Sequence, residues 1–324
     1  SSKGAVDAKK FSGINDGGSC GLQGSRIGFK GEEALGNGLK AVFTLEYGTD
    51  STSFNSAATT AGGGTLNNVR QSFVGLTGGF GTVSLGRQYA PSYDYLGNTS
   101  SNGVTQVHAS NNLVGFFTTM QTGSGARWNN SVKYVSPNFS GFEGRAIYAF
   151  GEQIRDSYGD ASTDASMLGL GGSYTNGPLF VTAMYQQILE NDALALDNGQ
   201  KAYALGGSYD FKVVKVFANY IREKTELGAA DLTAKYWSLG AGIPVSQAGA
   251  VQLEYAQFKT DLDETKSKGF SVGYTHALSK RTTLYTSLSR MSNEDAVGAT
   301  FTKFGIGTFG ASTTQFGAGI NHKF

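Results

Sequence analysis

The features that are rare or missing in this chain of 324 residues exclude several classes of protein. Its single cysteine, Cys20, excludes an internal disulfide and a cysteine-rich metal site. No stretch approaches 18 consecutive apolar residues, which excludes a helix that spans a membrane. The 26 basic and 25 acidic residues give a net charge of +1, so there is no broad basic field for nucleic acid. The first residues lack an apolar leader, and we expect any export signal to have been removed or never present.

Glycine and aromatic residues are abundant instead. The chain has 47 Gly, 21 Phe and 16 Tyr, but no Gly-X-Y repeat, so it is neither collagen-like nor disordered. The mean hydropathy of -0.22 is compatible with strands in which apolar and polar residues alternate.

Apolar residues recur at every second position, which is the period of a β-strand. In residues 315–324, Phe316, Ala318 and Ile320 share one face and Gln315 and Asn321 the other. The same split recurs along the chain, and its polar face carries Lys40, Glu46, Lys215, Asn219, Gln252 and Glu254.

The connections between these runs alternate in length. Short ones lie near residues 34–38, 78–81, 137–141, 176–178, 211–213, 244–249 and 277–280. Long ones lie near residues 11–24, 49–69, 88–128, 151–165, 188–200, 223–233, 259–268 and 292–314. These connections predict sixteen strands that run up and down, the first near residues 1–10, with all tight turns at one end. The four prolines fall in turns or loops, where no ladder needs their missing donor.

A meander of sixteen strands leaves two open edges unless it closes, and closure gives a cylinder too wide for side chains to fill. If the polar face lines that lumen, water fills it and the apolar face meets lipid. We therefore predict an all-β fold, a 16-stranded antiparallel transmembrane β-barrel formed by residues 1–324 as one domain. The opposite orientation, with the apolar face inside, describes a soluble sandwich or a lipocalin and is the alternative.

Several stretches resemble the general diffusion porins of Gram-negative outer membranes, in particular their beta-proteobacterial branch. They are SRIGFKGEEALGNGLKAVFTLEYG from Ser25, RQSFVGLTGGFGTVSLGRQ from Arg70, RWNNSVKYVSPNFSGFEGRAIYAFGE from Arg127 and YTHALSKRTTLYTSL from Tyr274. The final GINHKF is similar to the family's terminal strand, whose last Phe is read by the barrel-insertion machinery.

The resemblance implies a homotrimer of barrels in the outer membrane of a Gram-negative bacterium, each crossing it many times in contact with membrane lipid and lipopolysaccharide. It also implies that the third long loop, residues 88–128, folds inward and narrows the pore. By matching motif positions, Arg26, Arg70 and Arg127 are expected to form the arginine cluster of this constriction. Asp94 is the nearest acidic candidate, because residues 95–126 contain no charged side chain, and Lys133 is a further candidate.

Such a lining favours anions, because fixed charges select ions by sign. We expect passive diffusion of small anions and hydrophilic solutes, with no enzymatic activity, cofactor, metal or nucleic-acid partner. One alternative is a channel specific for a sugar or an organic acid, with a stacking track of Tyr93, Tyr95, Phe116, Phe117 or Trp128. Alternatives of another class are an outer-membrane enzyme and an adhesin.

Two motifs resemble catalytic signatures without their context. GIGTFG at 305–310 is followed by a loop and a strand, not by the helix that would hold a pyrophosphate. GFSVG at 269–273 places Ser271 inside an alternating strand, whereas a nucleophile elbow needs a strand, a turn and a helix. Three distant histidines make a metal site unfavourable. Of these, His108 is expected to be a loop residue that contacts solvent.

Overall fold

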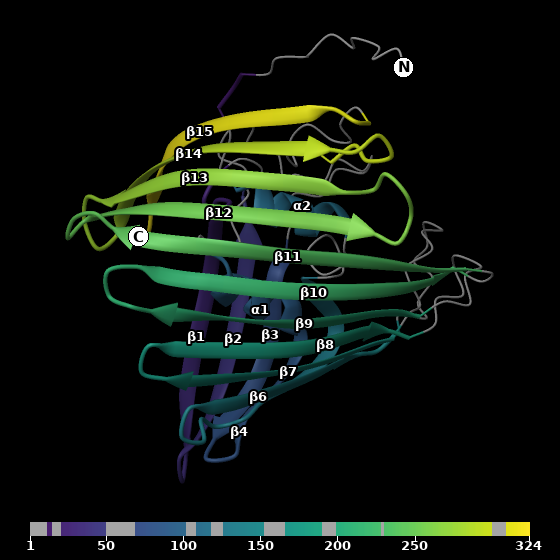
Figure 1. Ribbon diagram of the computed structural model, residues 1–324. Helices are drawn as coiled ribbons and strands as arrows, with labels where there is room; N and C mark the ends of the chain where they lie inside the picture. The colour runs from purple at the N-terminus through teal and green to yellow at the C-terminus, as the bar shows by residue number, and fades with distance from the viewer. Residues whose placement is uncertain are drawn as a thin grey trace.

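The computed structural model of the chain is one continuous antiparallel sheet that curves around two short helices (Figure 1). It describes residues 12–14, 21–49, 69–101, 108–117, 126–151, 166–189, 199–227, 230–299 and 309–324. Strands follow one another in chain order, and each is hydrogen-bonded to the next. The first eight are β1 (Arg26–Gly36), β2 (Leu39–Gly48), β3 (Val69–Gly78), β4 (Gly81–Tyr89), β5 (Arg127–Val135), β6 (Phe142–Ala149), β7 (Met167–Asn176) and β8 (Leu179–Ile188).

The second half of the sheet continues in the same way. It comprises β9 (Gln200–Asp210), β10 (Lys215–Leu227), β11 (Ala230–Pro244), β12 (Gly249–Thr260), β13 (Ser267–Ala277), β14 (Thr282–Asn293) and β15 (Ser312–His322). The helices α1 (Pro91–Thr99) and α2 (Ala109–Phe117) lie between β4 and β5 in the chain. Neither described helix is long and apolar enough to cross a membrane.

The predicted orientation of the two faces is confirmed. Large apolar side chains stand on the convex face, where Phe29 is 61% exposed, Leu239 56% and Phe316 73%. Polar neighbours of these residues point the other way, and Glu254 is buried on the concave face. An apolar exterior around a polar interior is the inverse of a soluble sandwich or lipocalin, so that alternative is wrong.

The short connections that were predicted lie at one end of the sheet, as expected. Between β1 and β2, Asn37 has φ 49° and Gly38 has φ 77°. A two-residue hairpin of this type needs both central residues in the left-handed region, which Asn-Gly supplies at the lowest steric cost. The turn therefore fixes the register of the first pair, in which Gly36 lies opposite Leu39.

One predicted connection is wrong. Residues 223–233 were expected to form a long loop, but β10 and β11 continue in register as far as the pair Leu227 and Ala230. The backbone ladder forms regardless of side-chain polarity, and at its start the exposed Arg222 stands between the buried Ile221 and Glu223.

The predicted first strand, residues 1–10, lies outside the described residues. Among the strands that the structure describes, β1 and β15 are the two ends of the sheet order. The fold class, an all-β antiparallel sheet of the barrel type, agrees with the prediction from alternation.

The apolar exterior provides a test of which face of the sheet meets lipid. Replacing Leu239, which lies on the apolar face between Trp237 and the turn after β11, by Lys places a charge in hydrocarbon. We expect a loss of about 2–4 kcal/mol in the free energy of unfolding in lipid vesicles. The matched variant Val213→Lys, in the short turn before β10, should lose at most about 1 kcal/mol because the cost falls near the interface. Equal losses would contradict the assignment.

Candidate functional site

The connection between β4 and β5, residues 90–126, is here called the inward segment. Its two described helices, α1 and α2, lie against the concave face of the sheet (Figure 1). The backbone N–H of Ala90 donates to the carbonyl of Ala126 at 3.1 Å and joins its two ends. Helix α1 contacts β4 and β6 to β10, while α2 contacts β11 to β14. The expectation that the third long loop folds inward is therefore confirmed.

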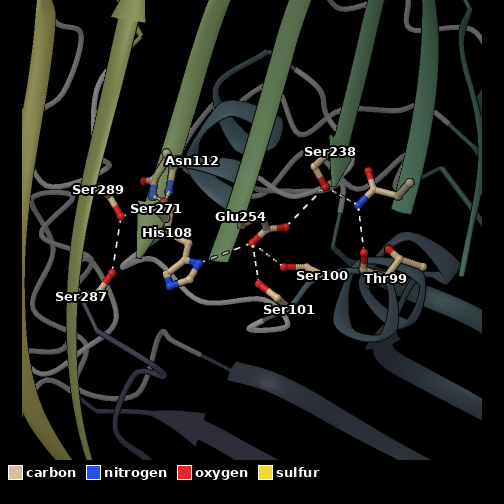
Figure 2. Close-up of polar contacts among 12 residues, drawn as sticks. Thr99, Ser100, Ser101, His108, Asn112, Ser238, Glu254, Ser271, Ser287 and Ser289 are labelled. Carbon is tan, nitrogen blue, oxygen red and sulfur yellow. Dashed lines mark hydrogen bonds and ion pairs between the residues drawn. The ribbon is translucent and has the colours of Figure 1, made fainter. Parts of the chain in front are cut away.

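A buried carboxylate on the wall holds the middle of the inward segment (Figure 2). Glu254 of β12 accepts hydrogen bonds from Ser100 at 3.0 Å and from Ser101 at 3.4 Å. Its Oε2 also lies 3.4 Å from Nδ1 of His108, and Oε1 accepts from Ser238 at 3.3 Å. The segment has no charge of its own after Asp94, so the wall supplies the charged group that fixes it.

This arrangement corrects the prediction for His108. Its side chain is 1% exposed and lies between the start of α2 and the wall, so it is not a loop residue in contact with solvent. A neutral, hydroxyl-rich loop gave no signal of burial, because the partner Glu254 is 146 residues away in the chain.

Hydroxyl groups of the wall continue the contact on both sides of Glu254. The backbone N–H of Ala109 donates to Ser271 at 2.8 Å, and Ser289 donates to the same hydroxyl at 2.8 Å (Figure 2). On the other side the amide of Asn219 donates to the carbonyl of Thr99 at 3.1 Å. These contacts satisfy backbone groups at the end of α1 and the start of α2, where a helix leaves them unpaired.

Two wall glycines allow the helices to pack closely. A Cβ on Gly206 would lie 2.8 Å from the Tyr95 hydroxyl, and one on Gly269 would lie 2.6 Å from Cβ of Ala109. Any larger residue would force α1 or α2 away from the wall. Glycine in these strands therefore reflects a close approach of the inward segment.

The predicted arginines Arg26 and Arg70 converge on one carboxylate of β2. Nε of Arg70 lies 2.6 Å from Oε1 of Glu46, and Nη1 of Arg26 lies 3.9 Å from the same oxygen. Arg70 also donates to the hydroxyl of Tyr89 at 2.9 Å. Two cations thus share one anion.

A β-bulge brings Arg70 to this position. In β3 the exposed Ser72, Val74 and Leu76 share a face, and strict alternation would send Arg70 to that outer face as well. The register between β2 and β3 shifts here, because Glu46 pairs with Gln71 and Tyr47 with Val69. Bulges re-aim side chains in this way, and the shift lets Arg70 reach Glu46.

Arg127 is held by aromatic rings and not by a carboxylate. Its guanidinium carbon lies 4.9 Å from the ring centre of Tyr89 and 5.5 Å from that of Tyr93, and these two rings are stacked 3.9 Å apart. Burial, reinforced by Tyr89, raises the pKa of Tyr93, so its ring stays neutral. Within the described part of the chain, Arg127 forms no ion pair, and its buried Nε has no hydrogen-bond partner.

Asp94 belongs to a second group of charges. Its Oδ2 lies 2.6 Å from Nη1 of Arg145 and 3.4 Å from Nζ of Lys133. Arg145 also pairs with Glu143, two residues before it on β6. Asp94 therefore pairs with Lys133 and Arg145 and not with the arginine cluster. The expectation that it is the acidic partner of Arg26, Arg70 and Arg127 is not what the geometry shows.

The two groups are neighbours, because Lys133 donates to the backbone carbonyl of Tyr89 at 2.9 Å. The structure thus brings all five predicted residues into one region at the start of the inward segment. Sequence reasoning missed Glu46 as the shared counter-ion, and it missed Arg145 and Glu143. Both latter residues alternate with the exposed Phe142 and Tyr148, and this period indicated the inner face.

The region holds more positive than negative charge. Its cations are Arg26, Arg70, Arg127, Lys133 and Arg145, and its carboxylates are Glu46, Asp94 and Glu143. These named groups leave a surplus of two positive charges, and the unpaired Arg127 carries one of them. Arg87 of β4 lies near Arg127 and donates to Val69 and Asn129 but forms no ion pair among the described residues, so it adds a further positive charge.

The structure argues against the alternative in which aromatic rings form a stacking track for one specific solute. Tyr95 and Trp128 are each 1% exposed, Tyr95 against the wall and Trp128 in a cluster with Ala90, Ile147 and Ala149. Burial also raises the pKa of Tyr95. Neither ring can contact a solute, and the side chains of Phe116 and Phe117 lie outside the described ones.

The structure does not place the GFSVG motif before the helix that a nucleophile elbow needs. Ser271 lies within β13, is buried and accepts from Ala109, and β13 leads through a short turn to β14 and not into a helix. Most of the GIGTFG motif lies outside the described residues.

Comparisons with known proteins agree with this geometry. A family model described as Gram-negative porin matches residues 4–296. Outer membrane porin protein 32 of Delftia acidovorans is 34% identical over 322 residues, which cover 95% of this chain and 86% of that protein.

Solved structures of porins are also similar to this chain. The anion-selective porin from Comamonas acidovorans superimposes with a TM-score of 0.79 at 31% identity and covers 94% of this chain and 90% of its own. OmpT of Vibrio cholerae, described in a trimer form, has a TM-score of 0.64 at 15% identity, with 92% and 91% covered, and shows the fold alone.

The anchoring carboxylate can be tested directly. In Glu254→Ala, Ser100, Ser101 and His108 lose their shared acceptor in a buried place, which we expect to cost about 3 kcal/mol and to loosen the inward segment. Single-channel recordings should show increased current noise, and proteolysis should cut the segment faster. Glu32→Ala removes an exposed ion pair with Lys40 and is the control. Unchanged noise and cleavage would contradict the anchoring role.

Proposed function

This chain belongs to the Gram-negative porins, which are outer-membrane proteins, and on that premise we propose that it forms a water-filled, anion-selective channel for small hydrophilic solutes. The observation that carries the anion selectivity is the surplus of positive over negative charge beside the inward segment. The relative from Comamonas acidovorans, described as an anion-selective porin, supports the same conclusion.

Selectivity follows from ion physics. The inward segment occupies part of the lumen and brings ions close to the charged wall, where low-dielectric surroundings focus the field. Two unit charges 4 Å apart in water interact by about 1 kcal/mol, which corresponds to about a fivefold change in local ion concentration. A small surplus is therefore sufficient for a measurable preference.

Arg127 is the residue on which this proposal concentrates the selectivity. Arg26 and Arg70 share Glu46, and Lys133 and Arg145 are offset by Asp94 and Glu143. The Arg127 guanidinium instead rests on Tyr89 and Tyr93, which orient it without cancelling its charge. Its remaining donors can receive a passing anion, and a guanidinium keeps its charge at any working pH.

The neutrality of the inward segment is part of this mechanism. Between Tyr95 and Ala126 no side chain is charged, so the segment narrows the lumen without adding a negative field opposite the arginines. Asp94 is the exception, and its two cations remove its effect. The sign of the net charge that an ion meets in the pore is then set by the side chains of the wall.

The selectivity proposal predicts opposite shifts in two variants. Arg127→Ala should lower the ratio of anion to cation permeability by about fivefold, and Glu46→Gln should raise it by a similar factor, because each changes the surplus by one charge. Reversal potentials in planar bilayers across a salt gradient measure both. Lys280→Ala, in the short turn after β13, should change little. A wild-type preference for cations would overturn the proposal.

We also propose a homotrimer embedded in membrane lipid. An apolar groove of about 530 Å³ on the outer wall of β1 to β4 supports a contact with a second copy, and its lining includes Phe43, Val74, Leu76, Val83 and Leu85. A trimer form is described for OmpT, a neighbour in fold.

Light scattering of the protein in detergent, corrected for bound detergent, tests the assembly. We expect a protein mass three times the 34.0 kDa of one chain. Three equal conductance steps per insertion event would agree with it. A protein mass of one chain would contradict the trimer while leaving the channel proposal intact.

A further inference from the structure

The part of the inward segment between Asp94 and Arg127 contains a single group that can change its charge near neutral pH. This stretch has no Asp, Glu, Lys, Arg or Cys, and its titratable side chains are Tyr95 and His108. A phenol stays neutral below about pH 9, whereas an imidazole ordinarily titrates near about pH 6.5. The charge that this stretch carries between about pH 4 and pH 8 therefore depends on His108.

The wall group that His108 contacts is also titratable, and both groups are buried (Figure 2). The side chains of His108 and Glu254 are 1% and 0% exposed, and Nδ1 lies 3.4 Å from Oε2. The same oxygen accepts from Ser100 and Ser101, while Oε1 accepts from Ser238 of the wall. The segment is thus held on the wall through a pair whose charge depends on pH.

The groups around this pair do not change their charge in the same pH range. Tyr236 of β11 and Tyr95 of α1 are its titratable neighbours, and both are phenols. Strands β13 and β14 face it with serine hydroxyls such as Ser271, and α2 has no charged residue. No lysine or arginine of the described residues forms an ion pair with Glu254. The pair therefore titrates as one coupled unit.

Acid removes the attraction within the pair. When both groups are protonated, an imidazolium lies beside a neutral carboxyl, and one positive charge is left without a counter-ion. The carboxyl then carries a hydrogen of its own, so it accepts fewer hydrogen bonds from the serines. A buried charge without a partner is unfavourable, and water around a released segment would solvate it. The released segment binds more protons than the anchored one, so a fall in pH favours release.

The fold determines the direction in which a released segment moves. Its ends are joined by the hydrogen bond from Ala90 to Ala126 and continue into β4 and β5. On its outer side the wall is already in close contact, since a Cβ on Gly269 would lie 2.6 Å from Cβ of Ala109. The segment cannot pass through the sheet, and the free direction leads into the lumen. Release therefore narrows the channel.

We propose that His108 and Glu254 form an acid-sensitive latch, which holds the inward segment on the wall at neutral pH and releases it into the lumen in acid. Release closes the channel. The inference rests on the channel proposed above and adds a means by which the medium outside the cell regulates it.

The charges of the pore by themselves predict the opposite response to acid. The carboxylates Glu46, Asp94 and Glu143 lie beside the cations of the pore and also gain protons at low pH. Their neutralisation raises the surplus of positive charge, which favours a larger anion current. Closure in acid is therefore a signature of the latch and not of the charged lining.

Single-channel recordings at low voltage between pH 7.5 and pH 4.5 measure the closed fraction. In the wild type, one proton taken up on release should change the ratio of closed to open states by up to about tenfold per pH unit. His108→Asn keeps a donor for Glu254 but cannot be protonated, and its ratio should change little. The control His276→Gln, His322→Gln removes the other two histidines, at the short-turn end, and should close like the wild type. Equal closure in His108→Asn and the wild type would overturn the proposal.

The partner of His108 is tested by Glu254→Gln, which imitates a carboxyl that is always protonated. Its closed fraction at pH 7.5 should exceed that of the wild type, and its dependence on pH should be weaker. A variant that stays open at pH 7.5 and closes in acid as the wild type does would show that acid does not act through Glu254.

Hydrogen exchange in detergent locates the motion. After correction for the intrinsic effect of pH, amides of residues 108–117 should exchange faster relative to β12 at pH 5 than at pH 7.5. This acceleration should be absent in His108→Asn. Equal relative exchange at both pH values in the wild type would overturn the latch. The exchange measurement does not depend on ion preference, so a cation-selective channel would contradict the proposed function and leave the latch standing.

Discussion

The antiparallel ladder sends successive side chains to opposite faces of the sheet, and every other property of this protein depends on that constraint. One strand therefore carries two surfaces at once, as Tyr220 and Asn219 show on β10, the first exposed outside and the second buried inside. A residue inserted into a pair exchanges the faces beyond it. The bulge at Glu46 uses this property to bring Arg70 to its counter-ion.

The inward segment converts a wide cylinder into a selective one. It lies on the wall through a buried carboxylate, a set of serine hydroxyls and two glycines that permit close approach. Polar wall residues such as Asn219 and Glu254 thus face inward, as alternation requires, but they hold the segment and do not line water. The charges to which we assign the ion selectivity gather where the segment leaves β4 and returns to β5.

Both faces of the wall carry cations that no carboxylate of the described residues compensates. Inside, Arg127 rests on two tyrosines, and no carboxylate of the described residues pairs with it. Outside, the register places Arg222 opposite Lys235 and Lys235 opposite Lys259, and these like charges repel each other. In each case register or aromatic packing holds the cation in place without a carboxylate beside it.

The sequence by itself determined the strands, their two faces and the short turns, because a period of two and a dipeptide such as Asn37-Gly38 are local properties. Through its motifs it also indicated Arg26, Arg70 and Arg127. Only the tertiary structure decided that Asp94 pairs with Lys133 and Arg145, that His108 is buried against Glu254, and that residues 223–233 continue the strands. These outcomes depend on which distant residues the register and the bulges bring together, and no local pattern encodes a contact across 146 residues of chain.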